Sequence, residues 1–189
     1  MRSDLMSIFD KLKKSAEDAV KSLDNRSETF TFNALPESLA EMQALPEASL
    51  DSPFKTAALV VCALCAYPAD KQIGIEMLNW LRGPRPLSNM DISFLDDRYR
   101  DGFHVPFSYF KGATPGNNYT PLEPFTLTIS TNPYSEANEG YMKLFIKSGG
   151  ADEPRYVVLR QRGEDGKWFL WDQFLLVGIR TPKSEDPWA

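Results

Sequence analysis

Apolar positions near the start of the chain recur at the spacing of one helix face. Lysines and acidic residues are interleaved between them, for example Lys11, Lys13 and Asp10. The apolar positions, three or four residues apart, are Leu5, Ile8, Leu12, Ala16, Ala19 and Leu23. This period predicts an amphipathic helix. We expect residues 1–26 to form a helical extension that lies on the domain, or one that docks on a membrane surface or a partner protein.

The next hundred residues carry mainly helical patterns. Ser27 to Ala34 alternates aromatic and threonine residues, which is typical of a linker or a short edge strand. Pro36 is expected to open a helix that ends before Pro46. The run from Phe54 to Tyr67 is almost wholly apolar and predicts a helix buried on all sides. Two further helices are predicted to begin at Asp70 and Ser88.

Alternation with a period of two dominates the rest of the chain. Val105, Phe107 and Tyr109 predict an extended segment. Clearer alternation follows at Phe125 to Ser130, at Tyr141 to Ile146, around Val157 and Leu159, and from Trp168 onward. Glycine-containing turns separate the last of these runs. We therefore predict one α+β domain over residues 27–189, with N-terminal helices followed by a curved antiparallel sheet of four to six strands packed on the buried central helix.

Composition narrows the class of protein. The hydrophobic share of 42% supports an ordinary core, and the net charge of -5 argues against a nucleic-acid binder because phosphate contacts need a basic surface. No run reaches the length of a membrane span, and charges interrupt the N-terminus before a signal peptide could form. The two cysteines, Cys62 and Cys65, give no disulfide framework. We expect a cytoplasmic protein.

Motifs for catalysis are absent from the sequence. Cys62 and Cys65 form a CxxC pattern, but they lie in an apolar run and only one histidine, His104, could complete a metal site. His104 has carboxylates nearby in sequence but no partnered nucleophile. The glycine-rich loops match no phosphate-binding motif. We expect no cofactor and no metal, and we lean against an enzyme without excluding one.

Two sets of residues are candidates for binding. If Met142, Leu144 and Ile146 point inward, the opposite face of the sheet combines aromatic and cationic side chains, which suits a protein partner or simple cross-strand packing. The members of this predicted interaction face are Tyr141, Lys143, Phe145, Tyr156, Arg160 and Arg162. Alternatively, a cavity between sheet and helices could hold a small molecule and support an enzyme. Its predicted lining is Tyr109, Tyr119, Trp168, Trp171 and His104.

Several distinctive phrases resemble an uncharacterised family of bacterial proteins found in Gram-positive anaerobes. They are SYFKGATPGNNYTP at 108–121, KLFIKSGGADEPR at 143–155, WFLWDQFLLVGIR at 168–180 and the terminal DPWA. The resemblance runs over about residues 35–189 and implies an intracellular domain without an assigned activity. Within the last phrase, Trp188 is expected to be buried against its own domain or, as the alternative, against a neighbouring subunit, because a free indole gains nothing in water.

Overall fold

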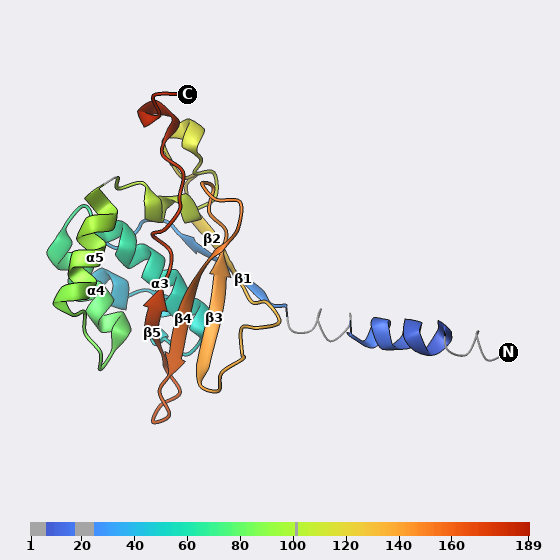
Figure 1. Ribbon diagram of the computed structural model, residues 1–189. Coiled ribbons are helices and arrows are strands. Elements are labelled where there is room, and N and C mark those ends of the chain that lie inside the picture. Colours follow the sequence, from blue (N-terminus) through green and yellow to red (C-terminus); the bar gives the residue numbers. More distant parts are fainter. Residues whose placement is uncertain (1–6, 18–24, 101) are drawn as a thin grey trace.

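The computed structural model describes residues 7–17, 25–100 and 102–189. Its centre is a five-stranded antiparallel sheet in which each strand pairs with the next one in the chain. The strands are β1 (Ser27–Phe32), β2 (Phe125–Ser130), β3 (Tyr141–Ile146), β4 (Arg155–Gln161) and β5 (Trp168–Gln173). The helices gather on one side of this sheet and leave its other side open (Figure 1). The α+β prediction is confirmed.

The apolar run predicted to be the central helix is α3 (Pro53–Ala66). Ser52 caps it by accepting a hydrogen bond from the Phe54 amide, and Pro53 occupies the first turn, where a missing N–H has no cost. Residues Thr56 to Cys65 of this helix are all buried. The inward side chains of the sheet, including Leu144 and Val157, are fully buried as well. Burial on every side of α3 explains why the sequence shows no polar stripe there.

Three more α-helices enclose α3 or extend its cover, namely α2 (Leu39–Gln43), α4 (Lys71–Arg82) and α5 (Asn89–Arg100). Helix α4 buries Met77, Leu78 and Leu81 on its inner face. Its Gly74 allows close approach to the preceding turn, because a Cβ there would lie 2.5 Å from the Cα of Tyr67. This close packing sets the start of α4 against the end of α3.

Two elements differ from the sequence expectation, one in its first residue and one in its type. The predicted helix at Pro36 begins later, at Leu39, because the Ser38 hydroxyl accepts from the Glu41 amide and caps the helix. The expected extended segment at Val105, Phe107 and Tyr109 is wrong. Val105–Tyr109 forms a 3₁₀ helix, η2, with Pro106 in its first turn. The other 3₁₀ helices are η1 (Pro46–Ser49), η3 (Pro115–Asn117) and η4 (Lys183–Glu185).

The segment Ser27 to Ala34 resolves as an edge strand rather than a linker. Phe30 and Phe32 of β1 face the core opposite Leu127 and Phe125, and both phenylalanines are buried. On the other face, the hydroxyls of Thr29 and Thr128 lie 2.8 Å apart. The period of two in the sequence therefore matches the two faces of this strand.

The ends of the chain are more exposed than expected. Residues 7–17 form a helix whose side chains are all exposed, so its apolar positions Ile8, Phe9 and Leu12 do not pack on the domain. The helical periodicity at 18–24 and before residue 7 falls outside the described residues. Trp188 is 93% exposed, so its predicted burial against its own domain is wrong. No helix in the described part of the chain is long and apolar enough to cross a membrane.

Candidate partner-binding face

The open side of the sheet carries the predicted aromatic and cationic side chains. Met142, Leu144 and Ile146 of β3 are buried, so the residues between them face solvent. The β3–β4 register then sets Tyr141 opposite Arg160, Lys143 opposite Val158 and Phe145 opposite Tyr156. We define the outer face by the aromatic and cationic side chains among these and by their neighbours on β5 and directly after it. Its members are Tyr141, Lys143, Phe145, Tyr156, Arg160, Trp171 and Phe174.

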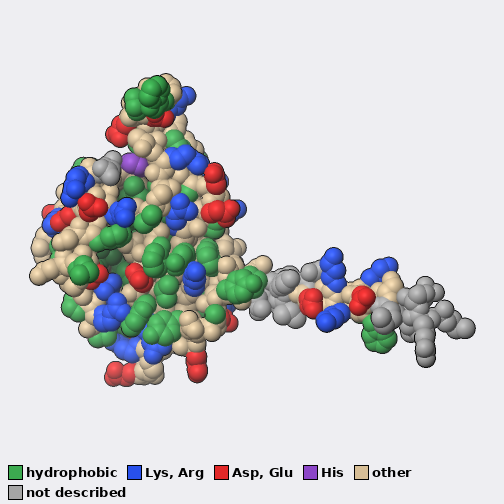
Figure 2. Space-filling model, in the orientation of Figure 1, with side chains coloured by type: hydrophobic (Ala, Val, Ile, Leu, Met, Phe, Trp, Pro, Cys, Tyr) green, Lys and Arg blue, Asp and Glu red, His purple; other side chains and the backbone are tan. Residues whose placement is uncertain are grey.

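The aromatic rings of the outer face contact one another across three strands. Tyr156 lies between two rings, with its centroid 6.1 Å from Phe145 and 4.6 Å from Phe174. Tyr141 meets Trp171 edge to face at 5.4 Å. Such arrangements contribute beyond simple area burial. The rings thus form two groups on one partly exposed surface, and Figure 2 shows apolar and basic side chains gathered together over these strands.

Cations lie directly over these rings. Lys143 Nζ is 3.8 Å from the centroid of Tyr156, and the Arg160 guanidinium carbon is 4.4 Å from that of Tyr141. Arg85, in the loop after α4, lies 3.8 Å over Trp171. None of the three makes an ion pair with a carboxylate among the residues that the structure describes. These positive charges contact ring faces and, for Arg85 and Arg160, backbone carbonyls, but no carboxylate in the described part of the chain.

Arg162, the sixth predicted member of the interaction face, behaves differently. It lies at the hairpin after β4, over the ring of Phe169, and its guanidinium pairs with Asp165. The hydrogen bond from Arg162 lowers the pKa of Asp165 to about 2. Its charge is therefore already balanced, and we leave it outside the outer face.

Trp171 of β5 lies on the outer face, at a β-bulge. Val158 pairs with Asp172 while the next residue, Leu159, pairs with Leu170, so Trp171 is the extra residue between them. Leu170 stays buried and Trp171 is exposed. Sequence reasoning assigned Trp171 to an internal cavity, which is the opposite side of the sheet. Trp171 follows the inward Leu170 and therefore points outward, and the bulge leaves Asp172 exposed as well.

A cleft opens beside the outer face, between the edge of β5 and helices α4 and α5. Its volume is about 310 Å³, and its apolar lining includes Leu87, Met90 and Phe94. Phe174 lines this cleft and also contacts Tyr156, so the cleft continues the aromatic surface. Met90 is 81% exposed, which is high for a large apolar side chain. We call this site the β5 cleft.

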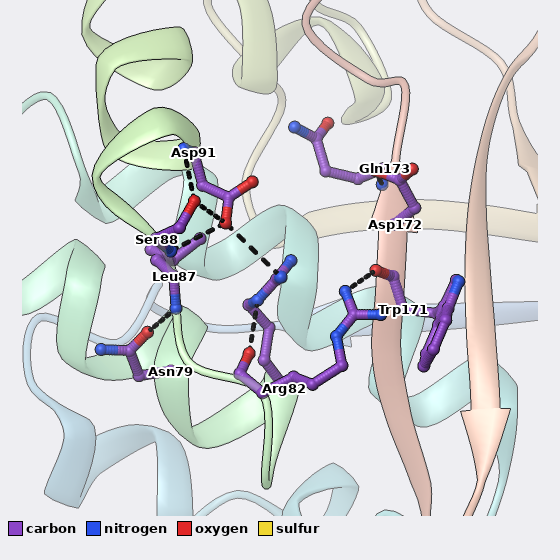
Figure 3. Close-up of polar contacts among 9 residues, drawn as sticks. Asn79, Arg82, Leu87, Ser88, Asp91, Trp171, Asp172 and Gln173 are labelled. Carbon is purple, nitrogen blue, oxygen red and sulfur yellow. Dashed lines mark hydrogen bonds and ion pairs between the residues drawn. The ribbon is translucent and has the colours of Figure 1, made fainter.

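A nearly buried cation forms one wall of the β5 cleft. Figure 3 shows Arg82 pointing from the end of α4 toward Asp91 of α5. Its Nε donates a 2.8 Å hydrogen bond to the Arg85 carbonyl, and its Nη2 is 3.7 Å from the Asp91 carboxylate. Burial lowers the pKa of Arg82. Asp91 also accepts hydrogen bonds from the Ser88 amide and hydroxyl. This network fixes the start of α5 against the end of α4.

The other residues assigned to an internal cavity are engaged in the packing of the domain. The Tyr109 hydroxyl donates to the Leu175 carbonyl, and the Tyr119 hydroxyl donates a 2.5 Å bond to the Arg180 carbonyl. His104 stacks on Tyr119 at 4.9 Å. The Trp168 amide donates a hydrogen bond to the Leu50 carbonyl, and the Trp168 carbonyl accepts one from the Thr56 hydroxyl. The five predicted residues are therefore not brought together, since only His104 and Tyr119 meet.

The groups with chemical reactivity are shielded. His104 Nε2 is buried and has no hydrogen-bond partner in the described part of the chain, and burial lowers its pKa. Cys62 and Cys65 are free and buried, and desolvation raises the pKa of both thiols. Within residues 7–17, 25–100 and 102–189, no group of three histidine, cysteine or acidic side chains could hold a metal ion.

Comparison with known families gives a match over most of the chain. A family model described as a domain of unknown function matches residues 34–183, which include β2 to β5 and all helices from α2 to α5. No curated protein and no solved structure matches the chain.

Proposed function

The chain belongs to the DUF6935 family of domains of unknown function, and we propose that it is a non-enzymatic binding module whose outer face takes an acidic, partly apolar segment of a partner protein. The outer face presents partly exposed aromatic rings, and its cations, like the adjoining Arg85, form no ion pair with a carboxylate in the described part of the chain. Aromatic rings and arginine are enriched where proteins recognise one another.

The proposal rests mainly on the positive charges of Lys143, Arg160 and Arg85, which lie over aromatic rings and form no ion pair with any described carboxylate. Each lies within 4.4 Å of a ring centroid and makes no ion pair in the described part of the molecule. The whole chain has a net charge of -5, so the outer face is a local cationic surface on an acidic protein. Charge complementarity then favours an acidic occupant, which would be steered to this face.

Two other occupants fit less well. The helix at residues 7–17 carries three lysines and two acidic residues, so its approach would add positive charge to a cationic surface. Nucleic acid would meet the acidic remainder of the domain, and its binding usually needs a broadly basic surface. A protein segment needs only a local match of charge and apolar area.

The β5 cleft suits an apolar anchor from the same partner. It is lined by Leu87, Met90 and Phe94 and is reached from the aromatic surface through Phe174. A pocket that receives one large side chain, beside a flatter polar contact, is a common arrangement in protein interfaces. We therefore propose a partner segment in which acidic residues flank one or two large apolar ones.

A display selection tests this function while the partner is still unidentified. Random peptides would be selected on the full chain and then compared on a Lys143→Glu/Arg160→Glu variant. We expect enriched peptides that are acidic and contain a large apolar residue, and we expect their binding to fall at least about tenfold in the variant. A Lys183→Glu variant changes an exposed lysine outside this face and should bind normally. Selected peptides that bind all three proteins equally would contradict the proposal.

A second role is supported by the exposed helix at residues 7–17. Ile8, Phe9 and Leu12 are each more than half exposed, and lysines lie beside them, as in helices that attach to membrane surfaces. We propose that this extension, residues 1–26, is separate from the domain at 27–189 and binds a membrane surface. Full-length protein should then bind anionic vesicles at low salt, whereas Phe9→Glu should not. Equal binding of both would exclude this helix as the anchor.

The setting proposed for this module is the bacterial cytoplasm. It is supported by the sequence resemblance over about residues 35–189 and by the two free, buried cysteines. An acidic partner and an anionic membrane surface are both available there. Fractionation of cells that express the tagged full chain would test the assignment, since secretion to the medium would contradict it.

A further inference from the structure

A second hollow lies on the open side of the sheet, where β2 and β3 separate. These strands pair only through Ile129 with Ile146 and Ser130 with Phe145. Beyond that point the segment around Lys111 takes the place of β3, because the Lys111 amide donates a 2.8 Å bond to the Thr126 carbonyl. The divergence leaves a cleft of about 580 Å³. We call it the β2–β3 cleft.

The floor of this cleft is rigid. Ser108 is fully buried, and its hydroxyl accepts a 2.6 Å bond from Ser148 while donating to the Val105 carbonyl. The Gly149 amide donates to the Ser108 carbonyl at 2.8 Å. A Cβ at Gly149 would lie 1.9 Å from the Ala113 carbonyl oxygen, so only glycine fits there. The two walls are thus held at a fixed separation by buried hydrogen bonds and one close contact.

The charges along the cleft all have the same sign. Lys111 and Lys147 line it, and neither makes an ion pair with any carboxylate that the structure describes. Among its described lining residues there is no aspartate or glutamate, although the chain has 26 of them. Two lysines without a neighbouring carboxylate create a positive potential, and the low-dielectric walls of a cleft strengthen it.

Hydroxyl groups complete the lining. Thr126, Thr128 and Ser130 line the cleft from β2. The Thr128 hydroxyl already shares a hydrogen bond with Thr29 and the Thr126 hydroxyl donates to the Pro124 carbonyl, so a ligand would meet the remaining hydrogen-bonding capacity of these two groups and the Ser130 hydroxyl. Phe145 and Pro154 supply an apolar side. Lysine, hydroxyl and backbone donors are the groups that bind phosphate and carboxylate oxygens, while an apolar wall accommodates an organic body.

We propose that the β2–β3 cleft binds a small organic anion that carries phosphate or carboxylate groups, with Lys111 and Lys147 balancing its charge. The site is distinct from the β5 cleft and does not depend on the partner-binding role of the outer face. A bound anion would neutralise the two lysines beside Phe145 and so change the charge that a protein partner meets. The domain would then respond to the concentration of a small metabolite.

Residue-resolved titration tests this site. Full-length ¹⁵N-labelled protein would be titrated with sodium phosphate and, separately, with citrate, at constant ionic strength, with glycerol as the uncharged control. We expect saturable shifts of the Gly112, Lys147 and Gly149 amides for at least one anion and none for glycerol. Comparison of the two anions separates a phosphate ligand from a carboxylate ligand.

Matched variants decide the outcome. A Lys111→Met/Lys147→Met variant should weaken anion binding at least about tenfold, because it removes both charge-assisted contacts. Lys167→Met removes an exposed lysine on the β4–β5 hairpin and should leave binding unchanged. The amide spectrum also reports whether each variant is folded. Shifts that spread over many lysines without saturation, or equal binding by the double variant, would overturn the site. Acidic peptides would still bind the outer face in that case, which separates this inference from the proposed function.

Discussion

The guanidinium carbon of Arg85 lies 3.8 Å from the centre of the Trp171 ring, and Arg85 Nη2 donates a 3.0 Å hydrogen bond to the Trp171 carbonyl. One side chain thus contacts both the ring and the backbone of the same bulged residue. The contact joins the loop after α4 to the edge strand β5. It holds the indole over the outer face, where Tyr141 meets its edge.

A double-mutant cycle should detect this contact as a coupling. We expect Arg85→Met and Trp171→Ala to be less destabilising together than the sum of the two single changes, by about 0.5–1 kcal/mol, as found for exposed cation–π pairs. The measurement is urea unfolding of the four proteins. Additive effects would show that Arg85 and Trp171 do not interact in solution.

Tyr109 should contribute to stability through one buried hydrogen bond. Its hydroxyl donates to the Leu175 carbonyl, and both residues are buried. Tyr109→Phe keeps the ring and leaves that carbonyl without its partner, so it should lower the free energy of unfolding by about 1–2 kcal/mol. Tyr134→Phe is the matched control, because Tyr134 is 75% exposed. Equal stability of the two variants in urea would contradict the role of this bond.

His104 should titrate below its ordinary pKa of about 6.5. Burial lowers its pKa, and the nearby charge of Glu185 opposes this only in part. Because His104 is the only histidine, its imidazole proton signals can be followed by NMR without ambiguity. A midpoint at or above 6.5 would show that the ring is solvated and not held against Tyr119.

The same shift predicts a direction for stability. A histidine whose pKa is depressed in the folded state binds protons more readily when unfolded, so protonation favours unfolding. The contribution is present above pH 6.5 and is lost as the pH falls through the folded-state pKa. We expect His104→Phe to lose less stability than the wild type between pH 7 and pH 5. An identical loss in both proteins would assign the acid sensitivity to carboxylates alone.

The features that the sequence predicted correctly are those that appear as a pattern of apolar residues within a single helix or strand. The run from Phe54 to Tyr67 is apolar at nearly every position because α3 is covered on all sides. The alternation of Met142, Leu144 and Ile146 with Tyr141, Lys143 and Phe145 identifies the two faces of β3, since each residue step reverses the side-chain direction.

The features that it missed depend on contacts between distant segments. Trp171 reaches the outer face because the register with β4 turns its neighbour Leu170 into the core, and that register is set by another strand. Arg85 belongs to a turn-like GPRP segment, and only the packing of α4 beside β5 brings it to Trp171. The β2–β3 cleft depends on two strands that separate after two pairs, which neither strand's pattern reveals.

Chemical-shift mapping of a selected acidic peptide on the labelled full chain would locate the partner site on the domain. We predict that the perturbed signals lie on β3, β4 and β5, with the Trp171 indole among them, and that Lys143→Glu/Arg160→Glu weakens the binding that causes these shifts at least about tenfold. Perturbed residues on α2 and the exposed side of α4, or within residues 7–17, with Trp171 unchanged, would contradict a partner site on the outer face.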